Sequence, residues 1–502
     1  MNHSRDYGNN RNSETIGRGE EGELESSENL NFTIDRAIEK IGYGLFQSKL
    51  SIFTALLWMS DSMELMLLTI ISPTLQCLWS LSSYDVAIIT VVVFAGEALG
   101  SLAWGILSDK FGRRRILWIS TFFLVYFGLV TSLAPTFNWV LTVRFCVGIS
   151  LSALTQSITY FTEFLPTRYR SSSILLLQLA WAGGSVIECL LAILVLERLG
   201  WRYMIGFTTI PGILVLFIIP CIPKSPRYLL ECDELGEAYQ VLKSGAKQNC
   251  RALPPGELVH SVPSELPLIE RPQKQKGNLL ELASREYRLT SLLLSMIWYI
   301  GGFCYFGAVL LTTGLFQYDT HCVTRVHTNN TITDTRCKVL SEEELIYSLL
   351  ISFGEFPGIL VAVLFNDILG RKLTTIILFL IGSLFTLLLN ICTGVNDKII
   401  KTVFLFTARA CISGSLQVVY VYTPEVYATH IRSSALSMAN LMARFGMMTT
   451  SFAAVILLQT SFYAAITLYG VTGVIGAILT FLLPYETKGR NIGEYTEHKF
   501  IC

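Results

Sequence analysis

The sequence predicts an all-α integral membrane protein with twelve transmembrane helices in two six-helix halves. Only 15% of the 502 residues are charged and the mean hydropathy is +0.51, whereas soluble domains carry about 25% charged residues. Lys and Arg number 38, as do Asp and Glu, so the formal net charge is zero. Such an apolar chain lacks the surface of a soluble protein, and its neutral balance gives no electrostatic basis for binding nucleic acid.

Twelve apolar runs are long enough to cross a hydrocarbon core about 30 Å thick as helices. The first six lie near residues 50–73, 86–107, 115–134, 138–161, 172–196 and 204–222. The second six lie near residues 289–314, 345–366, 373–394, 400–422, 434–459 and 461–483. We therefore expect one half at residues 49–222 and the other at residues 289–483, an arrangement typical of secondary transporters.

Three polar segments flank these halves. Residues 1–48 and 484–502 are predicted to be tails, the first mostly disordered, and residues 223–288 a linker. Lys and Arg gather in the loops on one side, as in the run 113–115, whereas the opposite turns after spans one and three have neither. By the positive-inside rule, both tails and the linker face the cytosol of a vesicle or plasma membrane.

The long loop at residues 315–344 then faces the outside or a vesicle lumen. It holds Asn329 in a glycosylation sequon. It also holds Cys322 and Cys337, which can form a disulfide in an oxidising compartment, with Cys77 of the first outer loop as a third candidate. The other cysteines are scattered and show no metal-ligand spacing, so we expect neither a metal site nor a cofactor.

A charged motif occurs once in each half. Its members are Glu97, Asp109, Arg113, Glu163 and Arg170 in the first half and Glu355, Asp367, Arg371, Glu425 and Arg432 in the second. The glutamate, aspartate and first arginine have the same separations in both halves, and so do the second glutamate and arginine. We expect these charges to clamp the halves together at the cytosolic face and so to govern conformation. The alternative is that they only enforce membrane topology.

These motifs resemble the major facilitator superfamily in its sugar and organic-ion porter branches. The segments Pro223–Arg227 and Glu486–Arg490 add to the likeness, although Lys224 stands where the family pattern has an acid. The run Trp58–Glu64 is similar to the synaptic vesicle 2-related group within that superfamily. The resemblance extends from about Thr33 to Arg490 and implies a major facilitator fold and a transporter function, but it does not indicate the cargo.

Charges at membrane depth are costly unless they are paired or hydrated, so each is a candidate functional group. Asp61 and Glu64 lie one turn apart on span one, an arrangement suited to taking up and releasing protons. Glu188 in span five and Arg444 in span eleven are the deepest opposite charges, and whether they pair is open. The alternative for all four is a static, buried ion pair.

Further candidates for contact with a substrate or coupling ion lie on spans four, ten and eleven. They are Arg144, Arg409, Gln417 and Asn440. Each arginine begins a span that ends in a repeated glutamate, and it either binds an anionic group or pairs with an acid on a neighbouring helix.

The sequence has no Gly-x-x-x-x-Gly-Lys loop for ATP, and its histidines all lie outside the spans, away from any catalytic cluster. We therefore expect a secondary transporter rather than an enzyme. It would carry a small organic ion or zwitterion, with proton coupling, and act as a monomer in the lipid bilayer. The alternatives are a scaffold or receptor that keeps the fold, and a facilitative carrier of a neutral or anionic metabolite.

Overall fold

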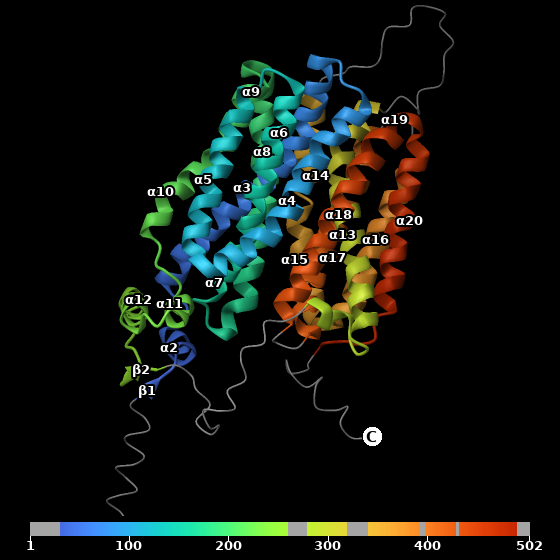
Figure 1. The fold of residues 1–502 in the computed structure, drawn as a ribbon. Helices are drawn as coiled ribbons and strands as arrows, with labels where there is room; N and C mark the ends of the chain where they lie inside the picture. The colour runs from blue at the N-terminus through green and yellow to red at the C-terminus, as the bar shows by residue number, and fades with distance from the viewer. Residues whose placement is uncertain (1–30, 260–278, 319–339, 392–396, 428–430, 489–502) are drawn as a thin grey trace, which may run out of the picture.

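A computed structural model of the chain describes residues 31–259, 279–318, 340–391, 397–427 and 431–488. Within these residues, twelve helical segments are long and apolar enough to cross a membrane. The helices of the first half lie side by side, and those of the second half form a neighbouring group (Figure 1). The predicted fold class is thus confirmed.

The first half contains six spans, and the fourth and sixth are built from consecutive short segments. Its elements are α3 (Leu45–Trp79), α4 (Ser83–Phe111), α5 (Arg113–Ser132), α6 (Phe137–Ser152), η1 (Ala153–Thr155), α7 (Gln156–Thr162), α8 (Thr167–Leu199), α9 (Trp201–Thr208), α10 (Ile210–Ile218) and η2 (Ile219–Cys221). The first helix is longer at both ends than the apolar run at 50–73, since polar residues next to the run continue the same helix.

The second half repeats this plan, with breaks in its second and fifth spans. Its elements are α13 (Arg288–Tyr318), α14 (Glu342–Ser352), α15 (Glu355–Leu369), α16 (Arg371–Leu388), α17 (Asp397–Val426), α18 (Arg432–Phe452), η4 (Ala453–Leu457), α19 (Leu458–Thr460) and α20 (Phe462–Phe481). The break between α14 and α15 falls at Gly354, directly before the repeated Glu355.

Glycines bring equivalent helices into backbone contact in both halves. A Cβ atom at Gly148 of α6 would lie 2.1 Å from the Val93 carbonyl oxygen of α4. In the second half, a Cβ atom at Gly358 of α15 would lie 2.1 Å from the Ala410 carbonyl oxygen of α17. Small residues at helix crossings are the usual means of close packing in membranes. Any larger residue at either glycine would therefore separate the two helices.

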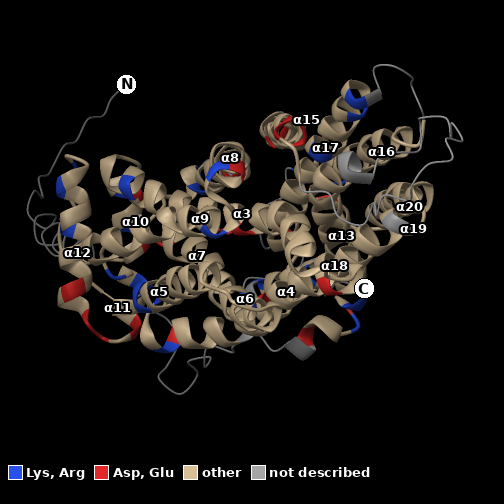
Figure 2. Cartoon of the chain, turned by 90° about the horizontal axis from the view of Figure 1, so that it is seen from above, with Lys and Arg blue, Asp and Glu red and all other residues tan. Residues whose placement is uncertain are grey.

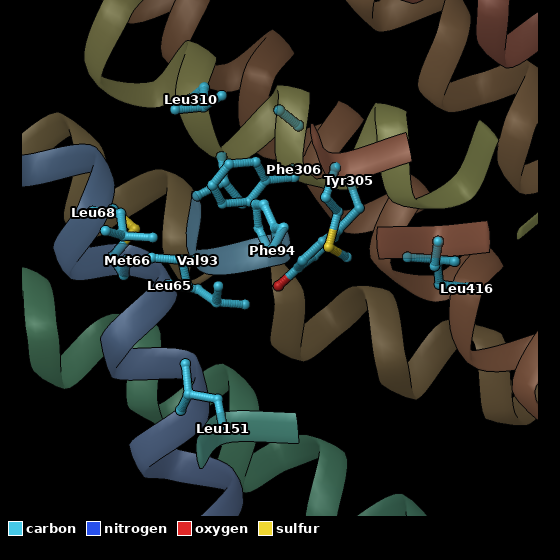
Figure 3. Packing of buried hydrophobic residues seen from close by; sticks show 14 of the residues in the cluster. Leu65, Met66, Leu68, Val93, Phe94, Leu151, Tyr305, Phe306, Leu310 and Leu416 are labelled. Atoms are coloured by element: carbon cyan, nitrogen blue, oxygen red, sulfur yellow. The ribbon is translucent and has the colours of Figure 1, made fainter. Parts of the chain in front are cut away.

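Apolar and aromatic side chains fill the region between the halves. The helix α4 packs on α18, and α8 packs on α14. Phe94 of α4 meets Phe306 of α13 edge-to-face, with ring centroids 4.8 Å apart, and Tyr305 lies beside them (Figure 3). The halves therefore contact each other through a packed core in the middle of the spans.

A small subdomain covers one end of the first half. Its elements are β1 (Asn31–Phe32), α2 (Ile34–Ile41), α11 (Pro226–Glu231), α12 (Leu235–Gln248) and β2 (Glu257–Leu258), while η3 (Leu279–Ala283) precedes α13. β1 and β2 pair in parallel, and the apolar face of α2 is buried against α11 and α12. Part of the predicted tail and part of the linker thus fold together. We call the end of the bundle with this subdomain and the first turns of α5 and α16 the basic end.

Candidate functional site

Most of the ribbon of the helices belongs to uncharged residues, with Lys, Arg, Asp and Glu at scattered positions along it (Figure 2). In the middle of the described spans are five carboxyl groups and three guanidinium groups: Asp61, Glu64, Glu97, Glu188 and Glu355, with Arg144, Arg409 and Arg444. Because burial of an unpaired charge is costly, the partners of these eight groups determine what the site can do.

Two of the arginines form ion pairs within their own half. Arg144 of α6 pairs with Glu64 of α3, and both side chains are almost fully buried. Arg409 of α17 pairs with Glu355 of α15, with Nη2 2.7 Å from Oε1. Both arginines therefore bind an acid on a neighbouring helix, and each pair leaves no net charge.

The third arginine joins the two halves. Arg444 of α18 pairs with Glu97 of α4, with Nη1 2.6 Å from Oε2. Glu188 is not its partner: this carboxylate interacts electrostatically with Glu64 and Arg144 instead. The repeated glutamates Glu97 and Glu355 thus have different partners, so the repeat is not symmetric here. Asp61 lies within electrostatic range of Arg444 as well.

Asp61 and Glu188 are the two acids left over. Both are buried, with 3% and 0% of their surface exposed. Glu188 Oε1 accepts a hydrogen bond from Thr208 Oγ1 at 2.9 Å. Its Oε2 atom and Asp61 Oδ1 have no hydrogen-bond partner, and neither acid forms an ion pair, within the part of the chain that is described. The middle of the spans therefore holds two more carboxyl groups than guanidinium groups.

Polar side chains also form contacts between the two halves. Gln417 Nε2 of α17 donates to Gln178 Oε1 of α8 at 2.9 Å. Trp181 Nε1 of α8 donates to the Tyr305 hydroxyl of α13 at 2.7 Å, and that hydroxyl donates to Glu355 Oε1 at 3.1 Å. Sequence reasoning missed Gln178 and Trp181, although a glutamine in an apolar run was a visible signal.

Asn440 also takes part in a contact between helices, within the second half. Its Oδ1 atom accepts a hydrogen bond from the Tyr420 hydroxyl at 2.8 Å, and its Nδ2 atom donates to the Leu436 carbonyl one turn earlier. The Tyr420 ring meets the Trp298 ring edge-to-face at 4.4 Å. Asn440 thus links spans ten and eleven next to an aromatic pair.

The repeated charges at the basic end pair within each half, contrary to the expected clamp between the halves. Arg113 Nη2 lies 3.1 Å from Glu163 Oε1, and the Ser225 hydroxyl donates to the same carboxylate. In the second half, Arg371 donates to both oxygens of Glu425, at 3.0 and 3.1 Å. Each pair ties the start of one span to the end of the next, so it stabilises one half rather than joining both.

The other members of the motif are placed less tightly. Asp109 is exposed and forms no ion pair with the described residues, and Asp367 lies 3.9 Å from Arg371. Arg170 and Arg432, from opposite halves, lie within electrostatic range of each other. The Nε atom of each has no hydrogen-bond partner in the described structure. Nearby acids oppose their mutual repulsion, since Asp35 and Glu39 act on Arg170 and Glu425 acts on Arg432.

The chain matches the family model described as "Sugar (and other) transporter" over residues 40–498. It belongs to this family. It is 40% identical to the synaptic vesicle 2-related protein of Xenopus laevis, over 93% of this chain and 84% of that protein. It is also 33% identical to the putative transporter SVOPL of Homo sapiens, over 91% and 92% of the two chains.

Solved structures confirm the major facilitator fold. One is the inward open conformation of the xylose transporter XylE from E. coli, which is 17% identical and has a TM-score of 0.65 over 89% of this chain and 98% of that one. The named members of this family are transporters and not enzymes, in agreement with the sequence prediction. Membership in the family, together with the twelve helices, implies that this chain is a multi-pass membrane protein with a small-molecule substrate.

The predicted outer loop lies beyond what the structure describes. Asn329, Cys322 and Cys337 are outside the described residues. Cys77, at the end of α3, is disulfide-bonded. Glycosylation at Asn329 and a disulfide between Cys322 and Cys337 stay predictions for this member of the transporter family.

The two ion pairs of the basic end are expected to differ in strength. Glu425→Gln should lower the free energy of unfolding by about 2 kcal/mol and Glu163→Gln by about 1 kcal/mol, because only Glu425 accepts two hydrogen bonds from its arginine. Thermal unfolding of the purified variants measures both. Equal losses would contradict the assignment of Glu425 as the stronger pair.

The pH dependence of the free energy of unfolding provides a second test at Glu163. Burial raises the pKa of this carboxyl, while Arg113 and Ser225 oppose the shift. The folded protein therefore holds the proton more tightly than the unfolded chain. The stability contributed by Glu163 is full below the usual carboxyl pKa and is lost as the pH rises through the raised pKa. Glu163→Gln should remove this slope, and an unchanged slope in the variant would show that another group causes it.

Proposed function

We propose that this member of the family is a secondary transporter of a small organic cation or zwitterion, coupled to protons and working by alternating access. The observation that carries the proposal is the excess of buried acid: Asp61 and Glu188 have no ion-pair partner in the described structure. A buried carboxyl group without a cation is stabilised by binding either a proton or a cationic ligand. Both groups lie in the middle of their spans, where facilitators bind substrate.

The position of Asp61 supports a site shared by both halves. Asp61 belongs to α3, and the Arg444–Glu97 pair beside it joins α18 to α4. A ligand that reached Asp61 would therefore compete with a contact that holds the halves together. Such competition couples binding to relative movement of the halves, which alternating access requires.

The charge balance also separates the proposal from its alternatives. An anionic substrate would need an available arginine, but Arg144, Arg409 and Arg444 each have a carboxylate partner. A scaffold or receptor would gain nothing from two unpaired buried acids. XylE is named as a xylose transporter, but at 17% identity the likeness shows the fold alone, so we do not propose a sugar.

The proposed orientation follows from charge. Arg113–Arg115 and Arg371–Lys372 begin α5 and α16 at the basic end. By the positive-inside rule this end faces the cytosol, with the subdomain of α2, α11 and α12 on the same side. We propose a monomer as the transport unit, because one chain supplies both six-helix halves and the residues that meet between them.

Uptake into proteoliposomes tests the proposed function. The purified protein is reconstituted, and a panel of organic cations, zwitterions, anions and neutral metabolites is offered with and without an acidic outside solution. We expect protein-dependent uptake of a cation or zwitterion that increases with the imposed pH gradient. Uptake of anions only would support the facilitative alternative, and no uptake with no ligand-induced thermal stabilisation across the panel would support the scaffold.

A further inference from the structure

A surface cavity at the basic end lies outside the candidate transport site. Its volume is about 500 Å³, and it opens between the start of α5, η2 and α11. Its lining includes Arg114, Arg115, Trp118, Pro220 and Tyr228, and one acid, Glu234, whose carboxylate lies 3.7 Å from Lys224 Nζ. The cavity therefore combines cations with apolar surface at the end of a transmembrane helix.

Two of the cations that line the cavity lack a carboxylate partner. Arg113 is engaged by Glu163, and Lys224 lies 2.6 Å from Glu237. Arg114 Nη2 instead donates to the Pro220 carbonyl oxygen at 2.8 Å. Neither Arg114 nor Arg115 forms an ion pair with any residue that the structure describes. Their two positive charges are therefore available to an anion.

The equivalent position in the second half is occupied by a carboxylate of the chain itself. The Tyr160 hydroxyl donates a hydrogen bond to the Pro223 carbonyl at 2.7 Å, and the Tyr422 hydroxyl donates one to the Tyr485 carbonyl at the same distance. Because these two contacts correspond, the residue that follows each carbonyl occupies an equivalent position in its half. That residue is Glu486 in the second half. Its carboxylate accepts hydrogen bonds from the backbone N–H groups of Arg371 and Lys372, at 2.9 and 3.0 Å.

The equivalent residue in the first half is Lys224. No described residue accepts from the backbone N–H groups of Arg113 and Arg114, which correspond to the two donors in the second half. Compared with the second half, the first half therefore has a lysine cation at the position where Glu486 provides a carboxylate. The first half keeps the lining of an anion site while lacking the anion that fills its counterpart.

An apolar stripe leads from this cavity along α5. Trp118, Phe122 and Tyr126 are 45%, 44% and 51% exposed. Their rings stack one turn apart, with centroids separated by 5.9 and 6.2 Å. Trp118 belongs both to the stripe and to the cavity lining. Because α5 is a transmembrane helix, this exposed face lies against lipid chains.

We propose that the cavity binds an anionic phospholipid whose headgroup carries phosphate monoesters. The phosphates contact Arg114 and Arg115, and the acyl chains lie along the Trp118 stripe. Arginine binds phosphate through parallel, charge-assisted hydrogen bonds, and basic pockets at membrane helices favour such headgroups. The aromatic stripe distinguishes a lipid from a soluble phosphate compound, which would have no use for it.

Binding of a fluorescent phosphatidylinositol bisphosphate to the protein in phosphatidylcholine nanodiscs tests the proposal. Arg114→Gln/Arg115→Gln should bind it about 25-fold more weakly, since each basic residue at an anionic membrane surface contributes about fivefold. Lys224→Glu should weaken binding by about tenfold or more, because it restores the internal carboxylate of the second half. Arg168→Gln, an exposed arginine at the same end, is the matched control and should bind like the wild type.

Two further measurements keep the test decisive. Arg115→Gln alone removes a side chain with no hydrogen bond or ion pair among the described residues, so its expected fivefold loss does not depend on refolding. Thermal unfolding of each variant in plain phosphatidylcholine verifies its fold. Unchanged lipid binding in the double variant, or equal binding of soluble inositol trisphosphate without a lipid chain, would overturn the proposal.

Discussion

Replacing Arg144 with leucine is expected to lower the free energy of unfolding by about 3–5 kcal/mol. The substitution leaves Glu64 without the cation it pairs with, and these side chains are only 0% and 4% exposed. Glu188 is a second carboxyl group within electrostatic range, which adds to the cost. Denaturant or thermal unfolding of the purified protein in lipid and detergent measures the loss.

The double variant Arg144→Leu/Glu64→Leu distinguishes loss of the pair from loss of packing. Replacing a whole buried ion pair with apolar residues is often neutral, so the double variant should recover most of the stability. A loss below about 1 kcal/mol in the single variant, typical of an exposed pair, would contradict a buried, charged Glu64–Arg144 pair. So would a double variant no more stable than the single one.

Arg444→Gln is expected to reduce transport by about 100-fold or more, the factor that corresponds to about 3 kcal/mol. Arg444 pairs with Glu97 across the two halves and also interacts with Asp61. Its loss therefore leaves Glu97 without its ion-pair partner, takes a nearby positive charge from Asp61, and removes the described ion pair between the halves. Initial uptake rates in proteoliposomes, corrected for the amount of folded protein, give the effect.

Two variants serve as controls for Arg444. Arg444→Lys keeps the charge and should retain measurable transport, whereas Arg444→Gln/Glu97→Gln removes both partners and should be more stable than Arg444→Gln alone. Wild-type uptake by Arg444→Gln would show that the pair with Glu97 has no part in the transport cycle.

The spans were predictable from the sequence because each depends on about 20 consecutive residues. Ion-pair partners were not, since they depend on how helices from different parts of the chain cross. Sequence reasoning singled out Glu188 and Arg444 as opposite charges and left their pairing open. The structure pairs Arg444 with Glu97, a residue assigned beforehand to the cytosolic cluster.

The basic end shows a similar limit. Repetition of the charged motif related Arg113 and Glu163 to Arg371 and Glu425, but the motif alone did not show that each arginine pairs with the glutamate of its own half. Repeated residues give equivalent contacts in each half, so the same pairing arises twice within halves rather than once between them. The helix α2 lies in the segment predicted to be a mostly disordered tail. It could have been predicted, because its buried residues at 34, 37, 38 and 41 follow the spacing of an amphipathic helix.

Substrate accumulation driven by a proton gradient is the most direct test of the proposed coupling through the unpaired acids. Wild-type protein, Asp61→Asn, Glu188→Gln and the exposed control Glu257→Gln are each reconstituted into proteoliposomes, and an acidic outside solution is applied. We expect the wild type and the control to accumulate substrate above equilibrium, and Asp61→Asn and Glu188→Gln to lose accumulation while substrate exchange without a gradient continues. Accumulation by both variants equal to that of the wild type would contradict proton coupling through these carboxyl groups.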